Sequence, residues 1–198
     1  LDQEHLLQQA SFLLESTWSA EADQAGALVG ASVAYAGDVN GDGFGDVIVG
    51  APAYDGGHTD EGRVYLYLGS ATGLSATPSK TIESNSTGAL FGTSIDGGGD
   101  VNNDGYDDII VGAPGYTKGQ SLEGRASIFL GNGTTGLDST PAWSIQSNKP
   151  NAKYGQSVSF AGDVNGDGFA DVAVGAPGFL HPNHDQDASA NEDGGGVF

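Results

Sequence analysis

Three short stretches of the chain place oxygen-bearing side chains at the same alternating positions. Each stretch reads D-x-N-x-D-G-(aromatic)-x-D, and the copies span residues 38–46, 100–108 and 163–171. Their first aspartates are 62 and 63 residues apart along the chain. Oxygens on alternate residues of a tight turn can all point at one centre, which is how proteins bind calcium. The pattern therefore predicts three calcium-binding loops.

The position of a residue within the loop decides which of its oxygen atoms can bind the calcium ion. Positions 1, 3, 5 and 9 supply side-chain oxygens, and position 7 can supply its backbone carbonyl. The glycine at position 6 permits the backbone conformation that bends the loop around an ion. Without a cation, three carboxylates in so small a space would repel one another. Because protein ligands fill such a site, we expect the ion to be structural.

Two other interpretations of the loops stay open. An EF-hand starts with a similar spacing but needs a ligand at position 12 and a helix after it. Here position 12 is Val49, Val111 or Val174, inside an apolar run that is typical of a strand. A solvated Asx turn without a metal is a reasonable explanation of one copy, and three copies with every ligand position filled disfavour it. The sequence therefore favours calcium.

Composition disfavours several function classes. The formal net charge is −20, with 26 acidic residues and only six basic ones. Such a charge disfavours nucleic-acid binding and attraction to anionic membranes. Cysteine is absent, which excludes disulfides and thiolate metal sites, and no apolar run is long enough for direct membrane insertion. The 34 glycines suit a β-rich protein with many tight turns.

The elements that position the loops recur with them. A small-residue strand leads into each loop, and a short apolar run follows it and closes with Gly-Ala-Pro at Gly50, Gly112 and Gly175. Apolar runs of this length between turns are typical of strands buried on both faces. Because the same elements return with each loop, the sequence predicts a repeat architecture.

Two further strands complete each unit. The third is predicted at 63–68 and 125–130, and the fourth near 80–83 and 143–146. Four antiparallel strands in roughly 60 residues describe one blade of a β-propeller, so the sequence predicts an all-β fold of such blades. In a four-stranded meander the first and third connections share a face. The glycine-rich third connections are therefore expected beside the calcium loops.

Together these motifs resemble the FG-GAP repeat family. Leu90-Phe-Gly92 and Lys153-Tyr-Gly155 precede the second and third loops, and Gly-Ala-Pro follows all three. The first copy departs from the pattern, with Val29 where the aromatic residue would stand. The family builds the β-propeller of integrin α subunits and of many bacterial surface proteins. The resemblance covers residues 18–198 and implies a propeller, bound calcium and an extracellular or cell-surface location.

The resemblance also implies the calcium ligands residue by residue. In the first loop they fall on Asp38, Asn40, Asp42, the carbonyl of Phe44 and Asp46. In the second they fall on Asp100, Asn102, Asp104, the carbonyl of Tyr106 and Asp108. In the third they fall on Asp163, Asn165, Asp167, the carbonyl of Phe169 and Asp171.

An aromatic residue stands two positions after the proline of each Gly-Ala-Pro motif: Tyr54, Tyr116 and Phe179. These residues belong to the second connections, on the face opposite the calcium loops. Loops on a rigid scaffold commonly carry binding residues. In the integrin-like family the equivalent face binds ligand, so the resemblance implies that these three residues bind a ligand. The alternative is that they fill gaps between blades.

Two segments stand apart from the repeats. Residues 1–17 carry leucine and alanine at helical spacing, which predicts a short amphipathic helix, although a strand over 12–14 stays open. The last second connection is longer than the others and contains His181 and His184 close to two aspartates. Imidazole and carboxylate groups are suitable ligands for a transition metal. A polar, flexible loop is the favoured interpretation.

No catalytic motif is present, whether G-x-S-x-G, H-E-x-x-H, a P-loop or a cysteine nucleophile. The sequence therefore predicts a calcium-stabilised, non-catalytic module for extracellular recognition, adhesion or surface assembly. Its partner would be a protein or glycan ligand, or further copies of the chain. The alternative is an accessory propeller part of a secreted hydrolase, such as a lipase or a polysaccharide-degrading enzyme.

Counting blades leads to an expectation about completeness. The chain supplies two blades, a third that stops at Phe198, and a leading strand near Trp18 that matches the fourth strand of a blade. Propellers typically need about 4–8 blades to close. The sequence therefore predicts an incomplete ring, which is either part of a longer polypeptide or completed by neighbouring copies.

Overall fold

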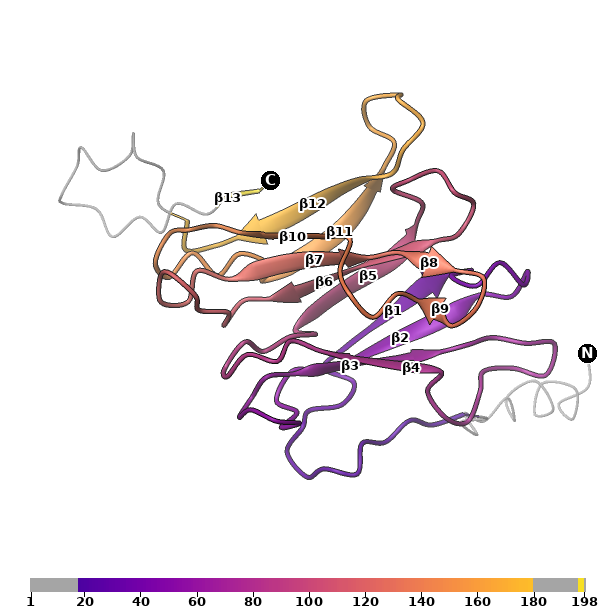
Figure 1. The fold of residues 1–198 in the computed structure, drawn as a ribbon, viewed down its shortest axis with the longest axis horizontal. Coiled ribbons are helices and arrows are strands. Elements are labelled where there is room, and N and C mark those ends of the chain that lie inside the picture. Colours follow the sequence, from indigo (N-terminus) through magenta and orange to yellow (C-terminus); the bar gives the residue numbers. More distant parts are fainter. Residues whose placement is uncertain (1–17, 180–195, 198) are drawn as a thin grey trace, which may run out of the picture.

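The computed structural model describes residues 18–179 and 196–197. Over this range the regular structure is all β, in antiparallel sheets that lie one after another across the molecule (Figure 1). The predicted fold class is confirmed, and the sheets formed by these residues do not close into a ring. The described residues contain no helix that is long and apolar enough to cross a membrane.

The first two sheets are four-stranded meanders, the arrangement of a propeller blade. The first sheet contains, in order, β1 (Ser32–Gly37), β2 (Asp46–Ala51), β3 (Arg63–Tyr67) and β4 (Lys80–Glu83). The second contains β5 (Ser94–Gly99), β6 (Asp108–Ala113), β7 (Arg125–Phe129) and β10 (Trp143–Gln146). The third contains β11 (Ser157–Gly162), β12 (Asp171–Ala176) and β13 (Gly196–Val197). We refer to these sheets as blades 1, 2 and 3.

The first strands of the blades lie next to one another. Strand β5 packs against β1 on one side and against β11 on the other. The second strands come next, and the third and fourth strands of blades 1 and 2 lie progressively farther from this row. This is how the inner strands of a propeller are arranged around its axis.

One part of blade 2 differs from the sequence-based prediction. Only a glycine-rich turn is expected over 131–136, but the structure forms a small hairpin of β8 (Gly131–Asn132) and β9 (Gly136–Leu137). The hairpin brings Leu137 into the core between blades 1 and 2, where the side chain is fully buried. The pairing of β8 with β9 is therefore accompanied by burial of Leu137.

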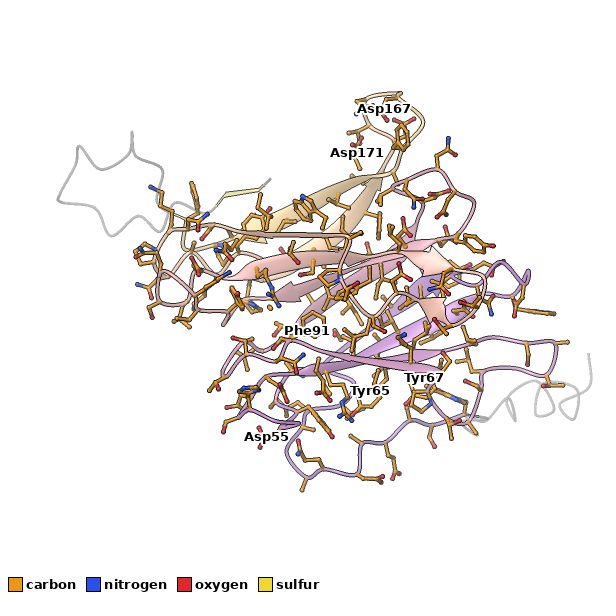
Figure 2. The ribbon with its side chains drawn as sticks, in the orientation of Figure 1. Asp55, Tyr65, Tyr67, Phe91, Asp167 and Asp171 are labelled. Atoms are coloured by element: carbon orange, nitrogen blue, oxygen red, sulfur yellow. The ribbon has the colours of Figure 1, made fainter. Side chains whose placement is uncertain are left out.

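The core consists of layers between the blades. Consecutive residues of β6 point to opposite faces, so Ile109 packs toward blade 1 and Ile110 toward blade 3. Phe91 lies between the first two blades, 6.0 Å from Phe129 between ring centroids (Figure 2). The run Ile109-Ile-Val111 is buried on both faces, as its unbroken apolar sequence predicts.

The glycines of the repeated motifs meet where one blade packs on the next. The Gly92 carbonyl accepts a hydrogen bond from Ser32 Oγ at 2.6 Å, and a β-carbon on Gly50 would lie 2.2 Å from the same oxygen. One blade further on, the Gly155 carbonyl accepts a hydrogen bond from Ser94 Oγ at 2.8 Å, and a β-carbon on Gly112 would lie 2.0 Å away. Neither contact leaves room for a side chain. The recurring glycines therefore allow close backbone approach between blades.

The predicted leading strand near Trp18 is wrong, because the described chain has no strand before Ser32. Trp18 instead packs edge-on against Tyr67 of β3, with ring centroids 4.8 Å apart, and its Nε1 donates to the Ser75 carbonyl at 2.8 Å. Together with Ala20, Ala22 and Val29 it packs on the outer face of blade 1. These side-chain contacts hold the segment in place of backbone pairing. The predicted helix over 1–17 and the histidines at 181 and 184 lie outside the described residues.

Candidate calcium-binding loops

The three predicted loops each connect the first two strands of a blade. Figure 2 labels Asp167 and Asp171 in the third loop, between β11 and β12 at the top of the view. Before each loop the register of the leading strand shifts by one residue, at Tyr35/Gly37, Gly97/Gly99 and Phe160/Gly162. A bulge of this kind bends a strand and redirects the residues that follow it.

The aspartate at position 1 folds each loop back on itself. Its carboxylate accepts hydrogen bonds from the backbone N–H groups at positions 5 and 6. In the first loop, Asp38 Oδ1 accepts from Asp42 N at 3.0 Å and Oδ2 accepts from Gly43 N at 2.8 Å. The same bonds recur in the second and third loops at distances between 2.8 and 3.2 Å.

The asparagine at position 3 and the aspartate at position 5 are hydrogen-bonded to each other. Asn40 Oδ1 accepts from Asp42 N at 3.0 Å, while Asn40 Nδ2 donates to Asp42 Oδ2 at 3.0 Å. Asp42 Oδ1 accepts from Phe44 N at 2.9 Å. Each of these bonds recurs in the other two loops. Local Asx-type bonds therefore hold the side-chain oxygens near one another.

The aspartate at position 9 ties the loop to the rest of its blade. Asp46 Oδ2 accepts from Val39 N at 3.0 Å, and Oδ1 accepts from Gly69 N, in the third connection, at 2.8 Å. Asp108 makes the same two contacts, with Val101 and Gly131. The first and third connections thus share a face, as predicted. In the third loop, Asp171 Oδ2 accepts from Val164 N at 2.9 Å.

Burial and hydrogen bonding shift the pKa values of the loop carboxylates in opposite directions. Asp46 and Asp108 are fully buried. Burial raises the pKa of Asp46 and raises the pKa of Asp108 to about 6, although N–H donors offset part of the effect. In the exposed third loop, N–H donors, that of Gly168 first, lower the pKa of Asp163. The buried carboxyl groups are therefore harder to ionise without a cation nearby.

The residues present fit calcium by the chemistry of their donors. Every candidate ligand offers oxygen, as calcium prefers, and Gly43 at position 6 has a φ of 87°. In the described geometry the carboxylates are turned toward N–H groups, and no three acidic or histidine side chains of residues 18–179 and 196–197 form a metal site. Each carboxylate oxygen has two lone pairs, so it can accept an N–H and still contact an ion.

The repeated loops and flanking motifs correspond to a known family. The family described as FG-GAP repeat matches residues 29–67, 91–129 and 154–195, which is more than half of the chain. The chain belongs to the FG-GAP repeat family. The three matched segments contain the three predicted calcium loops.

The curated relatives of the chain include integrin subunits and a phospholipase. The chain is 39% identical over 164 residues to integrin alpha-PS5 of Drosophila melanogaster, covering 79% of this chain and 16% of that protein. It is 34% identical over 175 residues to integrin alpha-5 of Xenopus laevis, covering 83% of this chain and 16% of that protein. It is also 34% identical over 149 residues to the human phosphatidylinositol-glycan-specific phospholipase D, covering 71% of this chain and 18% of that protein. The chain thus spans about a sixth of the length of these relatives.

The aromatic residues that follow the Gly-Ala-Pro motifs of these FG-GAP repeats are in contact with their own blades. The guanidinium carbon of Arg63 lies 3.6 Å from the ring centroid of Tyr54, and that of Arg125 lies 4.1 Å from the ring centroid of Tyr116. Tyr116 is only 8% exposed, whereas Tyr54 and Phe179 are half-buried. The contacts of Tyr116 favour the gap-filling alternative, and ligand binding by these residues stays a prediction.

Two buried glutamates organise the same FG-GAP connections and are not singled out by sequence reasoning. Glu61 is fully buried, and its Oε1 accepts hydrogen bonds from Gly56 N and Gly57 N, both at 2.6 Å. Burial would raise the pKa of Glu61, but N–H donors from Gly57, His58 and Gly56 outweigh burial and lower it. Glu123 accepts in the same way from Lys118 N and Gly119 N. The repeated Glu-Gly-Arg triplet is the sequence signal for this arrangement.

Proposed function

We propose that this chain is a non-catalytic, extracellular recognition or adhesion module that holds three calcium ions. The observation that carries the proposal is that the side-chain oxygens at positions 1, 3 and 5 accept the same backbone hydrogen bonds in all three loops. Positions 1, 3, 5, 7 and 9 would hold the ion in each loop, with position 7 acting through its backbone carbonyl. These are the fifteen residues that the family resemblance implies.

Calcium would stabilise the blades by neutralising charge. Each loop places at least three carboxylates within nine residues, on a chain with a formal net charge of −20. Because the position-9 aspartates of blades 1 and 2 also hold the third connection, the ion would tie the first and third connections together. Calcium sites of extracellular modules commonly have dissociation constants of about 10⁻⁴ to 10⁻³ M. Such an affinity suits a protein that works outside the cell.

The partner is proposed to be a protein or a glycan, or a further copy of the chain. Two features support this proposal: the relatives that are integrin subunits, and an array of packed blades that displays loops on two faces. The formal charge of −20 argues against nucleic acid as the partner. Pull-down from a mixture of candidate proteins and a glycan array, each run with and without calcium, test the proposal. The proposal would be contradicted if the chain bound neither proteins nor glycans at millimolar calcium and was a monomer by light scattering.

A second candidate function is an accessory role beside a hydrolase. It is favoured by one observation, the match to a phospholipase D over 71% of this chain. The chain itself carries no catalytic motif of the common hydrolase classes. Pull-down of the chain with an esterase, a phospholipase and a glycosidase, each with and without calcium, tests this role. Stable capture of one of these enzymes, or a change in its turnover when the chain is added, would favour the accessory role.

A further inference from the structure

The second calcium loop reaches into the first through a residue that is not one of the predicted ligands. Asp107 stands at position 8 of the second loop, and its Oδ2 accepts a hydrogen bond from Asp38 N at 2.8 Å. In return, Asp107 N donates to the Asp38 carbonyl at 3.3 Å. Asp38 is position 1 of the first loop, so both of its backbone polar groups are bonded to Asp107.

The chain leaves space for this contact. A β-carbon on Gly37 would lie 2.3 Å from Asp107 Oδ2, and Gly37 has a φ of 87°. A side chain at position 37 would displace the Asp107 carboxylate from Asp38. The glycine before the first ligand residue therefore makes the bond between the loops possible.

Two other groups of blade 2 lie against the same loop. The ring of Tyr106 packs on Gly41, where a β-carbon would lie 2.7 Å from Cε1. Asn132 N, in the hairpin of blade 2, donates to the Val39 carbonyl at 2.9 Å. Blade 2 thus contacts the first calcium loop at Asp38, Val39 and Gly41, the segment in which the first ligands lie.

The contact between the second and third loops serves as an internal comparison. Ala170 occupies position 8 of the third loop, and its N donates to the Asp100 carbonyl at 3.0 Å. This backbone bond is the counterpart of the bond from Asp107 N to Asp38. Alanine has no carboxylate to accept from Asp100 N. The contact between neighbouring loops therefore occurs once with the side-chain bond, between the first and second loops, and once without it, between the second and third.

We propose that Asp107 is a positioning residue that couples calcium binding in the first loop to calcium binding in the second. The inference rests on the proposed function. Tyr106 and Asp108, which flank Asp107, are predicted ligands of the second loop. When these neighbours are held by an ion, Asp107 is held as well and keeps the backbone of Asp38 in place. The first loop is then already partly ordered when its own ion binds, so it binds more tightly.

Two consequences follow from this arrangement. Coupling between binding sites is reciprocal, so occupation of the first loop must strengthen the second by the same factor. Because only a backbone bond joins the second and third loops, their coupling must be weaker.

A mutant cycle on the full chain tests the proposal. Calcium is titrated while the backbone amide signals of Gly41 and Gly43 report the first loop by NMR, and those of Gly166 and Gly168 report the third. Asp104→Ala disables the second loop. We expect Asp104→Ala to weaken calcium binding in the first loop by about 5-fold or more, the lower end of typical allosteric coupling. In an Asp107→Ala background the same change is expected to have less than about a 2-fold effect.

Asp107→Asn provides the matched variant, because its side-chain oxygen still accepts from Asp38 N. This variant is expected to retain most of the coupling between the two loops. It therefore separates the contribution of the hydrogen bond from that of the negative charge. The contact between the second and third loops provides the comparison. Asp167→Ala disables the third loop, and the amide signal of Gly105 then reports calcium binding in the second loop. We expect this binding to weaken less than that of the first loop does in Asp104→Ala. Unchanged Gly166 and Gly168 signals in the position-107 variants show that the fold is retained.

Three results would overturn the inference. The first is an Asp104→Ala variant whose first loop binds calcium as tightly as the parent. The second is an effect of Asp104→Ala that is equally large with and without Asp107. The third is the absence of calcium-dependent shifts in all three loops, which would reject the proposed function together with the coupling. The first two results leave calcium binding intact, so the two failures are distinguishable.

Discussion

Asp46 and Asp108 occupy the position where each calcium loop returns to its sheet, and both are fully buried. Each uses one oxygen to close its own loop and the other to hold the third connection of its blade. The carboxylates at positions 1 and 5 belong to half-buried or exposed residues and accept hydrogen bonds from backbone N–H groups of their own loop. Aspartates that look equivalent in the sequence are therefore under different physical demands, and their substitution should have different effects.

At position 5, loss of one carboxylate should act most strongly on its own loop, and Asp104→Ala should also weaken the first loop through Asp107. We expect Asp42→Ala, Asp104→Ala or Asp167→Ala to weaken calcium binding in the altered loop by at least about tenfold, since ligand charge sets the affinity of such loops. Isothermal titration calorimetry measures the number of sites and their affinities. Asp23→Ala is the control, because Asp23 is exposed and lies outside the loops. Equal losses in Asp23→Ala and Asp42→Ala would mean that only net charge matters.

The raised pKa of Asp108 predicts that the second loop binds calcium less tightly in mild acid. With a pKa of about 6, roughly nine tenths of this group is protonated at pH 5 in the calcium-free protein. A protonated carboxyl group is a poor ligand, so the apparent dissociation constant should rise about tenfold from pH 7 to pH 5. NMR titrations of Gly105 at the two pH values measure the change. The third loop is the internal control for a general effect of pH, because the pKa of Asp163 is lowered.

Without calcium, Asp108 should make the free energy of unfolding fall as pH rises. An ordinary ion-paired aspartate, whose pKa is lowered, makes it rise with pH instead. The folded state binds the Asp108 proton more tightly than the unfolded state does, because burial raises its pKa. The contribution of this group to the free energy of unfolding is therefore highest below about pH 4 and falls as pH rises through about 6. Urea unfolding of the calcium-free protein and of Asp108→Asn, at pH 4.5 and 7, measures it. A parent protein whose change with pH matches that of Asp108→Asn would contradict the prediction.

At the scale of the elements, the glycines of the repeats limit how closely neighbouring blades can pack. We expect Gly112→Ala to destabilise the fold by roughly 1–3 kcal/mol or more, since the added β-carbon would lie 2.0 Å from the Gly155 carbonyl. Gly57→Ala is the matched control, because a β-carbon there meets nothing within 4 Å. Urea unfolding measures both variants. Equal stability of the two would contradict the proposed close approach.

The tyrosines of the second connections allow the packing and binding interpretations to be separated. Tyr116 is buried against the core and Tyr54 is half-buried beneath Arg63. Tyr116→Ser should therefore lower stability by roughly 3 kcal/mol, as truncation of a buried aromatic does, and Tyr54→Ser by less. Thermal unfolding and binding of an identified ligand are measured on both variants. A loss of binding in Tyr54→Ser without a comparable loss of stability would support the predicted ligand face.

Local features of the fold and site follow from the sequence more readily than long-range contacts. The loops, the buried β6 and the third and fourth strands are predicted because their spacing and apolar runs recur. The bond from Asp107 to Asp38 joins residues 69 positions apart, and no local pattern indicates it. The segment at Trp18 is wrongly predicted as a strand because its position in the repeat resembles that of Trp143. Whether such a segment forms a strand depends on the sheet edge beside it in the folded protein, and the spacing of motifs in the sequence does not reveal that edge.

At the scale of the whole molecule, blades packed in a row make the chain depend on every interface. The core lies in layers between blades, so loss of order in blade 2 would remove burial on both of its sides. A large negative net charge adds repulsion that opposes the compact state. Calcium binding would act against both effects at once, because each ion would sit beside an interface and carry two positive charges.

The last prediction is that removal of calcium lowers the melting temperature of the entire described array. A ligand that binds only the folded state stabilises it by about 2.7 kcal/mol at a concentration one hundred times its dissociation constant. Three occupied loops should therefore raise the melting temperature by well over ten degrees, and excess EDTA should reverse the change. Differential scanning calorimetry measures it, with magnesium at equal concentration as the control for simple screening of charge. An unchanged melting curve after chelation, with no metal found by elemental analysis before it, would contradict the calcium assignment.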